Sequence, residues 1–512
     1  MALALDLGLR GISVGLVERR LELQRIPKGQ NLTQRTLEHF YFWGVVDELR
    51  AARVMPPGYP IGGVTAYENL MSEYWYAPPG REIVRPYYFQ ANERLPQYQM
   101  EHVLRRRLAD LPNVETQFGW SAKAIEQDDD GVRVSIVEDG GSGRAVLEAD
   151  YVVGCDGGRS IVRDQIGIAR SGSDFDQLMV LAVFRSRELH EGLKRFPERS
   201  TYRVLHPELK GYWQFFGRID VGEGWFFHAP VPADTTTDNY DFQGLIQQVA
   251  GFTFACEFDH VGFWDLRISV AENYQVGRVF IAGDAAHSHP PYGGFGLNNG
   301  LEDATNLGWK LAAAVQGWGS EALLRSYSEE RRPIFKETGE NFIAAGIESD
   351  RRFLDRYNPH RDKSEFDRAW QELAAGPGLR VGSYEPNYEG SSVVVGPPDG
   401  TCSARGTHMF RARPGHHLTP RSLSTGCDVF EELGAGFTLL AFDVDDRTVQ
   451  GFERAAGALN VPLKIVRDSY HGGRQAYEAH LTLVRPDQYV VWTGDALPAD
   501  VKGAMAKVVG RG

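Results

Sequence analysis

Residues 277–310 restrict the fold of this chain more than any other segment. They read GRVFIAGDAAHSHPPYGGFGLNNGLEDATNLGWK: an apolar strand, a Gly-Asp pair, a loop of prolines and glycines, and a helix. Open α/β sheets bind ligands beyond the carboxyl ends of their strands, so a strand over 278–282 predicts that Asp284 faces a ligand. The loop glycines let a flat molecule approach the backbone, and the amides that begin the helix favour negative charge. The segment therefore predicts a site for a polyol joined to an electron-accepting ring, as in a flavin.

The composition excludes several other classes of protein. The 512 residues suffice for about three domains with a sizeable core. A net charge of −13 argues against nucleic acid as the main partner, because binding to its backbone depends on Lys and Arg. Four cysteines without a Cys-x-x-Cys pair predict neither a disulfide framework nor a metal site, and they suit a reducing cytoplasm. The sequence has no run of 18 apolar residues, so no membrane span is expected.

The chain begins with a short helical run, a turn and an apolar strand over 12–17 that ends at Glu18. In a dinucleotide-binding βαβ unit, an acidic residue at this place binds the ribose hydroxyls. It lies about 20 residues beyond a glycine-rich loop. Here that loop would fall at or before Met1 and is absent. Three explanations stay open: a chain that was cut, a misplaced start, or a wrong interpretation of the strand.

Hydrophobic periodicity divides the rest of the chain. The expected elements are helices over 33–49 and 97–108 and strands over 131–137, 145–150 and 151–155. Short aromatic-rich strands between about 175 and 275 predict an antiparallel sheet, and aromatic side chains between 200 and 230 are expected to line a pocket on it. After 420, the order strand, helix, strand, hairpin predicts a small separate α/β domain.

Two signatures at the right separation make a resemblance to a known family specific. Residues 155–163 read CDGGRSIVR, and residues 283–287 read GDAAH. They are similar to the Asp-Gly and Gly-Asp signatures of the flavin-dependent aromatic hydroxylases, the single-component monooxygenases of the 4-hydroxybenzoate and phenol hydroxylase kind. The run 289–298 is close to the version in phenol and chlorophenol hydroxylases. The C-terminal segment resembles the thioredoxin-like domain of phenol, hydroxyphenylpropionate and polyketide hydroxylases, which lacks redox cysteines, as here.

The resemblance covers almost the whole chain and implies a mixed α/β fold. Its parts would be a Rossmann-like FAD-binding domain of the 4-hydroxybenzoate hydroxylase type, an antiparallel substrate-domain sheet and a thioredoxin-like domain. The expected division is FAD-binding over 1–170 (without the N-terminal strand and the GxGxxG loop), substrate sheet over 171–275, FAD-binding and helices over 276–375, linker over 376–420, and thioredoxin-like domain without CxxC over 421–512.

The resemblance also implies FAD as cofactor and NAD(P)H as co-substrate. By the resemblance, Glu18 would contact the adenosine ribose, Arg35 the pyrophosphate or ribitol, and Gln97 and Asp284 the ribitol. The Pro291 carbonyl would lie near the reactive edge of the flavin, and the amides of Gly296, Leu297 and Asn298 would lie at its pyrimidine end. Asp156 and Arg163 would act less directly, by linking the flavin and nicotinamide sites.

In the resembled family, NAD(P)H reduces FAD, O₂ adds to give a C4a-hydroperoxide, and a phenolic ring takes the terminal oxygen beside its hydroxyl. We therefore expect a small phenolic substrate and a cytoplasmic enzyme, and the resemblance favours a homodimer. His289 and Tyr292 are the candidates for catalytic roles on the substrate side, the alternative being that both only shape the loop. His287 is expected to be structural, hydrogen-bonded inside the loop.

The sequence departs from the family in two places. Met1 aligns just after the last loop glycine of the family, so we expect the chain as written to bind FAD poorly or to misfold, and its true start to lie upstream. A missing central strand would also leave neighbouring backbone groups unpaired, at about 1–3 kcal/mol each if buried. Tyr292 stands where related phenol hydroxylases usually have Thr, which changes the polarity beside the expected ring.

Three alternatives remain. A flavin-dependent halogenase shares the first fold, but its Trp-x-Trp-x-Ile-Pro segment is absent, and Trp213, Trp225 and Trp264 stand singly. A flavin reductase of isoprenoid chains is a second enzyme class, which the thioredoxin-like tail disfavours. The third is a flavoprotein remnant without flavin, whose C-terminal domain serves only assembly.

Overall fold

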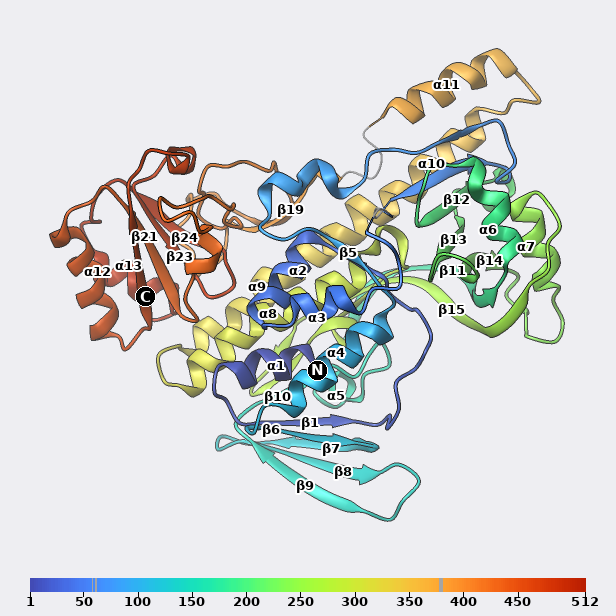
Figure 1. Ribbon diagram of the computed structural model, residues 1–512. Coiled ribbons are helices and arrows are strands. Elements are labelled where there is room, and N and C mark those ends of the chain that lie inside the picture. Colours follow the sequence, from blue (N-terminus) through green and yellow to red (C-terminus); the bar gives the residue numbers. More distant parts are fainter. Residues whose placement is uncertain (58, 60–61, 377–380) are drawn as a thin grey trace.

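The computed structural model describes residues 1–57, 59, 62–376 and 381–512. Two long helices, α8 (Phe295–Val315) and α9 (Glu321–Glu337), run through its middle (Figure 1). A large twisted sheet lies at one end of these helices and the C-terminal unit at the other. The expected mixed α/β class is confirmed.

Two small sheets bear the predicted nucleotide-binding strands. β1 (Val14–Glu18) pairs in parallel with β6 (Val114–Phe118), and β10 (Val152–Gly154) pairs in parallel with β17 (Val279–Ile281), which also pairs antiparallel with β16 (Gln275–Val276). Among the described residues no strand joins β1 to β10. The expected strand before the Gly-Asp pair is confirmed as β17, whose three apolar residues are all buried. The predicted hairpin strands are confirmed in an antiparallel meander of β7 (Trp120–Gln127), β8 (Val132–Glu138) and β9 (Arg144–Ala149).

Five helices belong to the same part of the chain: α1 (Ala2–Leu9), α2 (Gln34–Phe42), α3 (Val46–Ala51), α4 (Gln97–Ala109) and α5 (Ile161–Gln165). The single helix expected over 33–49 is two helices. Thr33 caps α2 by accepting a hydrogen bond from the amide of Thr36, and Gly44 breaks the run because its φ of 71° is left-handed. The helix expected over 97–108 is confirmed as α4.

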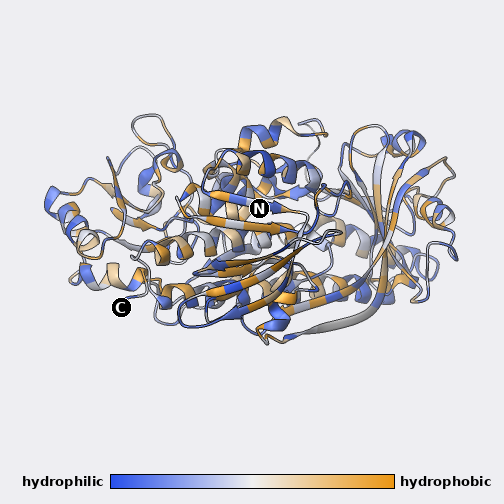
Figure 2. Cartoon of the chain, turned by 90° about the horizontal axis from the view of Figure 1, so that it is seen from below, coloured by the Kyte–Doolittle hydropathy of each residue, from blue (hydrophilic) through white to orange (hydrophobic). Residues whose placement is uncertain are grey.

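The expected antiparallel sheet is confirmed with eight strands. In spatial order they are β18 (His287–Ser288), β15 (Glu257–Ala271), β11 (Arg170–Arg185), β14 (Gly224–Val231), β13 (Gln214–Arg218), β12 (Thr201–Leu205), β3 (Gly63–Tyr67) and β4 (Trp75–Tyr76). Only the β12–β3 pair is parallel. Side chains of α6 (Arg187–Gly192) and α7 (Phe242–Ala250) pack with one face of this sheet in a core that contains Trp225 and Phe227. Apolar residues line its strands (Figure 2). The opposite face of the sheet borders a cavity.

The C-terminal unit confirms the predicted order of strand, helix, strand and hairpin. Its sheet has the order β22 (Leu463–Asp468), β21 (Phe437–Phe442), β23 (Leu481–Val484), β24 (Val490–Gly494), with only β21 and β22 parallel. All six residues of β21 are buried. The helices are α12 (Asp446–Ala458) and α13 (Val501–Val508).

The stretch expected as a linker is packed where the structure describes it; residues 377–380 of it lie outside the described residues. It contains β19 (Tyr384–Tyr388) and β20 (Cys402–Arg405). Tyr388, Val393 and Val394 are buried in a core shared with α8, α9 and the C-terminal sheet. Before it, α10 (Ala345–Arg356) and α11 (Lys363–Ala375) extend beside the large sheet (Figure 1).

Candidate functional site

The Gly-Asp pair lies at the carboxyl end of β17 and borders a single cavity of about 2570 Å³. Gly283 has a φ of 59° and begins a short turn, so the chain reverses there and presents Asp284 to the cavity. Gly300 of α8 packs closely on Gly283: a Cβ added to Gly300 would lie 3.4 Å from the Cα of Gly283. This close approach sets the distance between the loop and the helix that closes the site.

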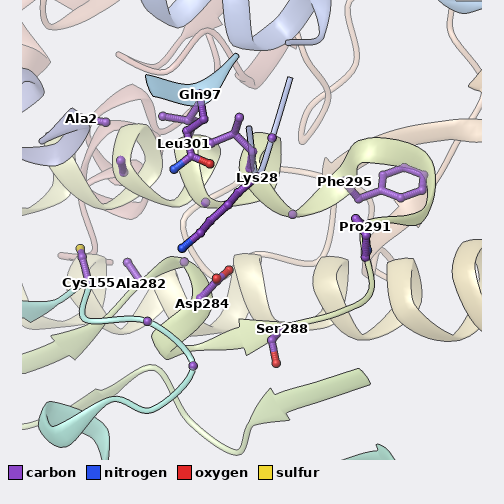
Figure 3. A pocket seen from close by; sticks show the side chains of 18 of the residues that line it. Ala2, Lys28, Gln97, Cys155, Ala282, Asp284, Ser288, Pro291, Phe295 and Leu301 are labelled. Atoms are coloured by element: carbon purple, nitrogen blue, oxygen red, sulfur yellow. The ribbon is translucent and has the colours of Figure 1, made fainter. Parts of the chain in front are cut away.

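A lysine faces this carboxylate from the opposite wall. The ammonium group of Lys28 points toward Asp284 in Figure 3. Burial raises the pKa of Asp284, and the charge of Lys28 opposes that rise, together with His287 and Arg170. Burial lowers the pKa of Lys28. The two groups therefore offer a hydrogen-bond acceptor and a cation to one ligand.

The first turn of α8 forms the wall beside Lys28. Gly294 precedes the helix with a φ of 68°, and the first amides of a helix have no partner within it. Gly29 packs against this turn, since a Cβ added there would lie 3.0 Å from Cδ2 of Leu297. Next to it, Gln30 is buried, lines the cavity, and has no hydrogen-bond partner on either side-chain atom among the described residues. Glycine at the close contact and an unsatisfied amide fit a flat polar ligand such as a flavin nucleotide.

Buried charges behind the cavity hold the loop and α8 together. Nε2 of His287 lies 2.5 Å from a carboxylate oxygen of Asp303, and Arg331 donates to its other oxygen at 2.8 Å. Burial alone would raise the pKa of Asp303, but His287 and Arg331 lower it to about 2. His287 also stacks on Phe335 with ring centroids 3.9 Å apart. These contacts agree with the structural role that we expect for His287.

The large sheet supplies the floor of the other half of the cavity. Seven residues, one from each of seven neighbouring strands, form a row across the sheet, which we call the floor row. All seven line the cavity: Tyr76, Thr65, Arg203, Phe215, His228, Leu181 and Gly262. Neighbouring strands lie about 4.8 Å apart, so this floor row spans roughly 29 Å. His228 stacks on Phe215 at 4.9 Å, and burial lowers its pKa to about 3, so the imidazole is neutral.

Arg203 and Asp350 form the polar end of this floor. Nη1 of Arg203 lies 2.9 Å from Oδ2 of Asp350, and Nε1 of Trp213 donates to the same oxygen at 2.6 Å. Trp213 and Phe215 are aromatic side chains from the interval where we expect a pocket lining, and Phe226 also lines the cavity. Trp225, from the same interval, is instead buried in the core on the other face.

Both catalytic candidates line the cavity. Nδ1 of His289 lies 2.6 Å from the carbonyl oxygen of Pro290, while its Nε2 is buried without a partner in the described part of the chain. Burial lowers the pKa of His289 to about 4. The ring of Tyr292 stacks on Trp213 at 4.2 Å, and its hydroxyl accepts a hydrogen bond from the amide of Trp213 at 3.2 Å. Burial raises the pKa of Tyr292.

Most of the predicted cofactor residues meet at this one cavity: Glu18, Gln97, Asp156, Asp284, Pro291, Gly296 and Leu297. Asp156 also caps α5, because its two oxygens accept hydrogen bonds from the hydroxyl of Ser160 and the amide of Val162. Gln97 donates to Glu101 at 2.7 Å.

Three predicted cofactor residues do not line the cavity. The role of Arg35 in cofactor binding stays a prediction: its guanidinium is bonded to Glu302, to Glu38 and to the segment 487–488 of the C-terminal unit. Arg163 instead joins the two signature loops, donating to the carbonyl oxygens of Gly158 and Ala285. The side chain of Asn298 is bonded to the backbone of residues 31, 33 and 294.

Sequence reasoning missed the cavity-lining residues Lys28, Gln30, Arg81, Arg203 and Asp350. The signal for Lys28 and Gln30 was present, since Lys28-Gly-Gln30 follows the strand that ends at Glu18 and precedes α2. No local pattern marks Arg203 and Asp350, which come from a strand and a helix 147 residues apart.

Among the described residues, every helix is too short or too polar to span a lipid bilayer. These described residues also contain no group of three or more His, Cys, Asp or Glu side chains arranged to hold a metal ion.

Known proteins resemble the chain along its whole length. A model of the FAD binding domain matches residues 1–341, and a model of the C-terminal domain of aromatic-ring hydroxylases matches residues 411–512. The rifampicin monooxygenase of Streptomyces venezuelae is 33% identical over 67% of each chain. The aklavinone 12-hydroxylase RdmE of Streptomyces purpurascens is 28% identical over 100% of this chain and 97% of its own.

Solved structures agree with these matches. The aklavinone-11 hydroxylase in complex with FAD and aklavinone has a TM-score of 0.82 at 26% identity, over 100% of this chain and 97% of its own. The rebeccamycin biosynthetic enzyme RebC with reduced flavin has a TM-score of 0.84 at 27% identity, over 100% of this chain and 96% of its own. The sequence signatures, the site and both comparisons lead to one conclusion: the chain belongs to the family of FAD-dependent aromatic-ring monooxygenases.

Proposed function

We propose that this protein hydroxylates a phenolic aromatic compound, consuming NAD(P)H and O₂ with FAD as its cofactor. The observation that carries the proposal is the continuity of the cavity. It runs without interruption from Asp284 and the first turn of α8 to the aromatic floor row on the large sheet. A flavin held at the first end would therefore face an aromatic substrate held at the second.

The residues that would hold FAD lie on both sides of its end of the cavity. Glu18 would bind the ribose hydroxyls, and Gln97 and Asp284 the ribitol, while Lys28 would compensate phosphate charge. The free amides at Gly296 and Leu297 would meet the electron-rich end of the ring. Bound FAD would supply the activation of O₂ for transfer of one oxygen atom to the substrate.

His289 would orient the substrate hydroxyl. Because its Nδ1 donates to a carbonyl, its Nε2 is an unprotonated acceptor with no partner in the described structure. A hydroxyl that donates to Nε2 leaves more electron density on its ring. The low pKa of His289 opposes full transfer of the proton, so its role is that of an acceptor.

Tyr292 would form the wall between the two halves of the cavity. Its stacking on Trp213 fixes the ring, and its raised pKa keeps the hydroxyl protonated at neutral pH. The hydroxyl can therefore donate a hydrogen bond to a substrate oxygen while it accepts one from the amide of Trp213. A cofactor and substrate that fill the cavity would also exclude water from the reacting atoms.

The size of the floor supports a substrate larger than a single ring. The floor row spans roughly 29 Å, several times the width of one ring. Relatives of the chain include proteins named as a polyketide hydroxylase of Streptomyces halstedii and as an aklavinone 12-hydroxylase. We therefore propose a multi-ring phenol as the substrate, with NAD(P)H docking transiently. We also propose a thioredoxin-like fold for the C-terminal unit and a homodimer in the cytoplasm.

The direct test is turnover of FAD-supplemented protein with NADH or NADPH and a panel of one-ring and multi-ring phenols. We expect O₂ uptake that depends on the phenol and, under ¹⁸O₂, a product that carries one ¹⁸O atom. Asp284→Ala should lose this activity, and Asp130→Ala in the exposed β7–β8 turn should keep it. Complete conversion of the NAD(P)H electrons to hydrogen peroxide with every phenol would contradict the proposal.

A further inference from the structure

Arg81 brings a positive charge into the substrate half of the cavity without a carboxylate partner. It begins the 3₁₀ helix η1 (Arg81–Tyr87) and lines the same cavity as Pro291 and Tyr292. Its guanidinium donates one long hydrogen bond, 3.3 Å, to the carbonyl oxygen of Gly293. Within the described parts of the chain, no ion pair joins it to an Asp or Glu.

The titratable side chains that act on this guanidinium are two tyrosines. They are Tyr384 of β19 and Tyr88, which follows η1, and burial lowers the pKa of Arg81 more than they raise it. The adjacent carboxylate of Glu82 is turned away and accepts a hydrogen bond from the amide of Gly80. Nε2 of Gln34 donates to the carbonyl oxygen of Arg81 at 2.7 Å, which fixes its backbone.

Three other cations that line the cavity are already compensated or bonded. Arg203 is paired with Asp350, and Lys28 faces Asp284. Arg94 donates to the side chain of Asn31 and to carbonyl oxygens of residues 200 and 218. The cavity beside the loop 291–294 therefore has a surplus of positive charge. Arg81 is half-buried, and a partly desolvated cation without an anionic partner is stabilised when an anionic ligand binds beside it.

We propose that Arg81 binds an ionised hydroxyl group of the aromatic substrate, a different one from the neutral hydroxyl that donates to Nε2 of His289. This inference rests on the proposed function and adds the form in which the phenol binds. The O–H bond of the phenol breaks, its proton passes to solvent, and the oxygen keeps the electron pair beside the guanidinium. Charge-assisted hydrogen bonds to Arg are stronger than neutral ones, so the phenolate is favoured over the phenol. A phenolate ring is the more electron-rich partner for oxygen transfer.

The test needs neither turnover nor flavin. Alizarin, a planar three-ring phenol whose colour changes on ionisation, is titrated with acid and base in the presence of saturating protein. Quenching of the fluorescence of Trp213 and Trp264, which line the cavity, reports binding separately. We expect the ionised form to bind at least about tenfold more tightly, which lowers the pKa of bound alizarin by at least about one unit.

Matched variants assign the effect. Arg81→Met should abolish the preference for the ionised form, and Arg81→Lys should keep part of it. Arg85→Met removes an exposed arginine of the same helix and should leave the preference unchanged. The proposal is overturned if wild-type protein binds both forms equally or binds neither, or if Arg81→Met keeps the preference. Failure of turnover with an intact preference would instead count against the proposed oxidation chemistry alone.

Discussion

The ammonium group of Lys28 and the carboxylate of Asp284 face each other across the cavity, from segments 256 positions apart in sequence (Figure 3). Each perturbs the other in the direction that keeps both charged, against the effect of burial. A ligand placed between them meets an acceptor on one side and a cation on the other.

Removal of the carboxylate should weaken cofactor binding. A hydrogen bond to a charged group contributes about 1.5–3 kcal/mol, so Asp284→Ala should raise the Kd for FAD about ten- to a hundredfold. Quenching of flavin fluorescence on titration measures the Kd. Asp130→Ala is the control, and an unchanged Kd in Asp284→Ala would remove this carboxylate from the site.

Removal of the lysine should change the pH dependence of the same binding. Lys28 lowers the pKa of Asp284, so Lys28→Met should raise that pKa further. Asp284 then becomes protonated at a higher pH, and FAD affinity should begin to fall at a higher pH than in the wild type. Kd values between pH 4 and 8 show this shift; parallel curves for both proteins would contradict it.

Because Asp303 is paired with both His287 and Arg331, the free energy of unfolding should decrease at low pH. The pKa of Asp303 is about 2 in the folded chain against 3.8 for the free group, so its charge stabilises the fold above pH 4 by about 2 kcal/mol. This contribution is lost as the pH falls from about 4 to 2. Asp303→Asn should cost about 3–5 kcal/mol at pH 7, since it leaves Arg331 buried without its partner, and less at pH 3. Urea denaturation at both pH values measures the difference.

The contact of the C-terminal unit with α9 should depend on Arg485. Its guanidinium donates to both oxygens of Glu330 at 2.7 and 2.8 Å and to Asp487, all fully buried. Arg485→Met should therefore destabilise the protein by about 3–5 kcal/mol. Arg467→Met breaks the exposed pair with Asp446 and should cost no more than about 1 kcal/mol. Equal free energies of unfolding for the two variants would refute the assignment.

His289 should affect the efficiency of oxygen transfer more than binding. His289→Ala removes the acceptor Nε2, so a larger share of consumed NAD(P)H should appear as hydrogen peroxide. The ratio of product to NAD(P)H measures this coupling, and His102→Ala, on an exposed position of α4, is the control. A His289→Ala variant with the parent rate and coupling would confine this residue to shaping the loop.

The sequence predicts the strand–loop–helix block well because its signals are local. Gly283, Asp284 and the glycines before α8 adopt their conformations for reasons that lie within a few residues. The large sheet and the C-terminal unit follow from periodicity in the same way. The division of the predicted helix 33–49 depends on one glycine, Gly44, whose left-handed φ of 71° ends α2.

Arg35 has contacts that sequence reasoning could not predict. An arginine near the start of a helix in a flavoprotein suits a phosphate, and that role stays a prediction, but the side chain also contacts Glu302 and residues 487–488. Those partners lie 267 and more positions away, so no local pattern indicates the contacts. The same limit applies to Arg203 and Asp350, which meet only after the sheet and α10 have packed.

In the floor row, each of seven strands contributes one residue to the surface that determines which ligand shape fits. Because side chains alternate between faces, replacement of one such residue alters the binding surface without disturbing the buried core behind it. Substitution of a single floor-row residue such as Gly262 or Phe215 can therefore change which substrate binds, while the residues at the flavin end of the cavity stay the same.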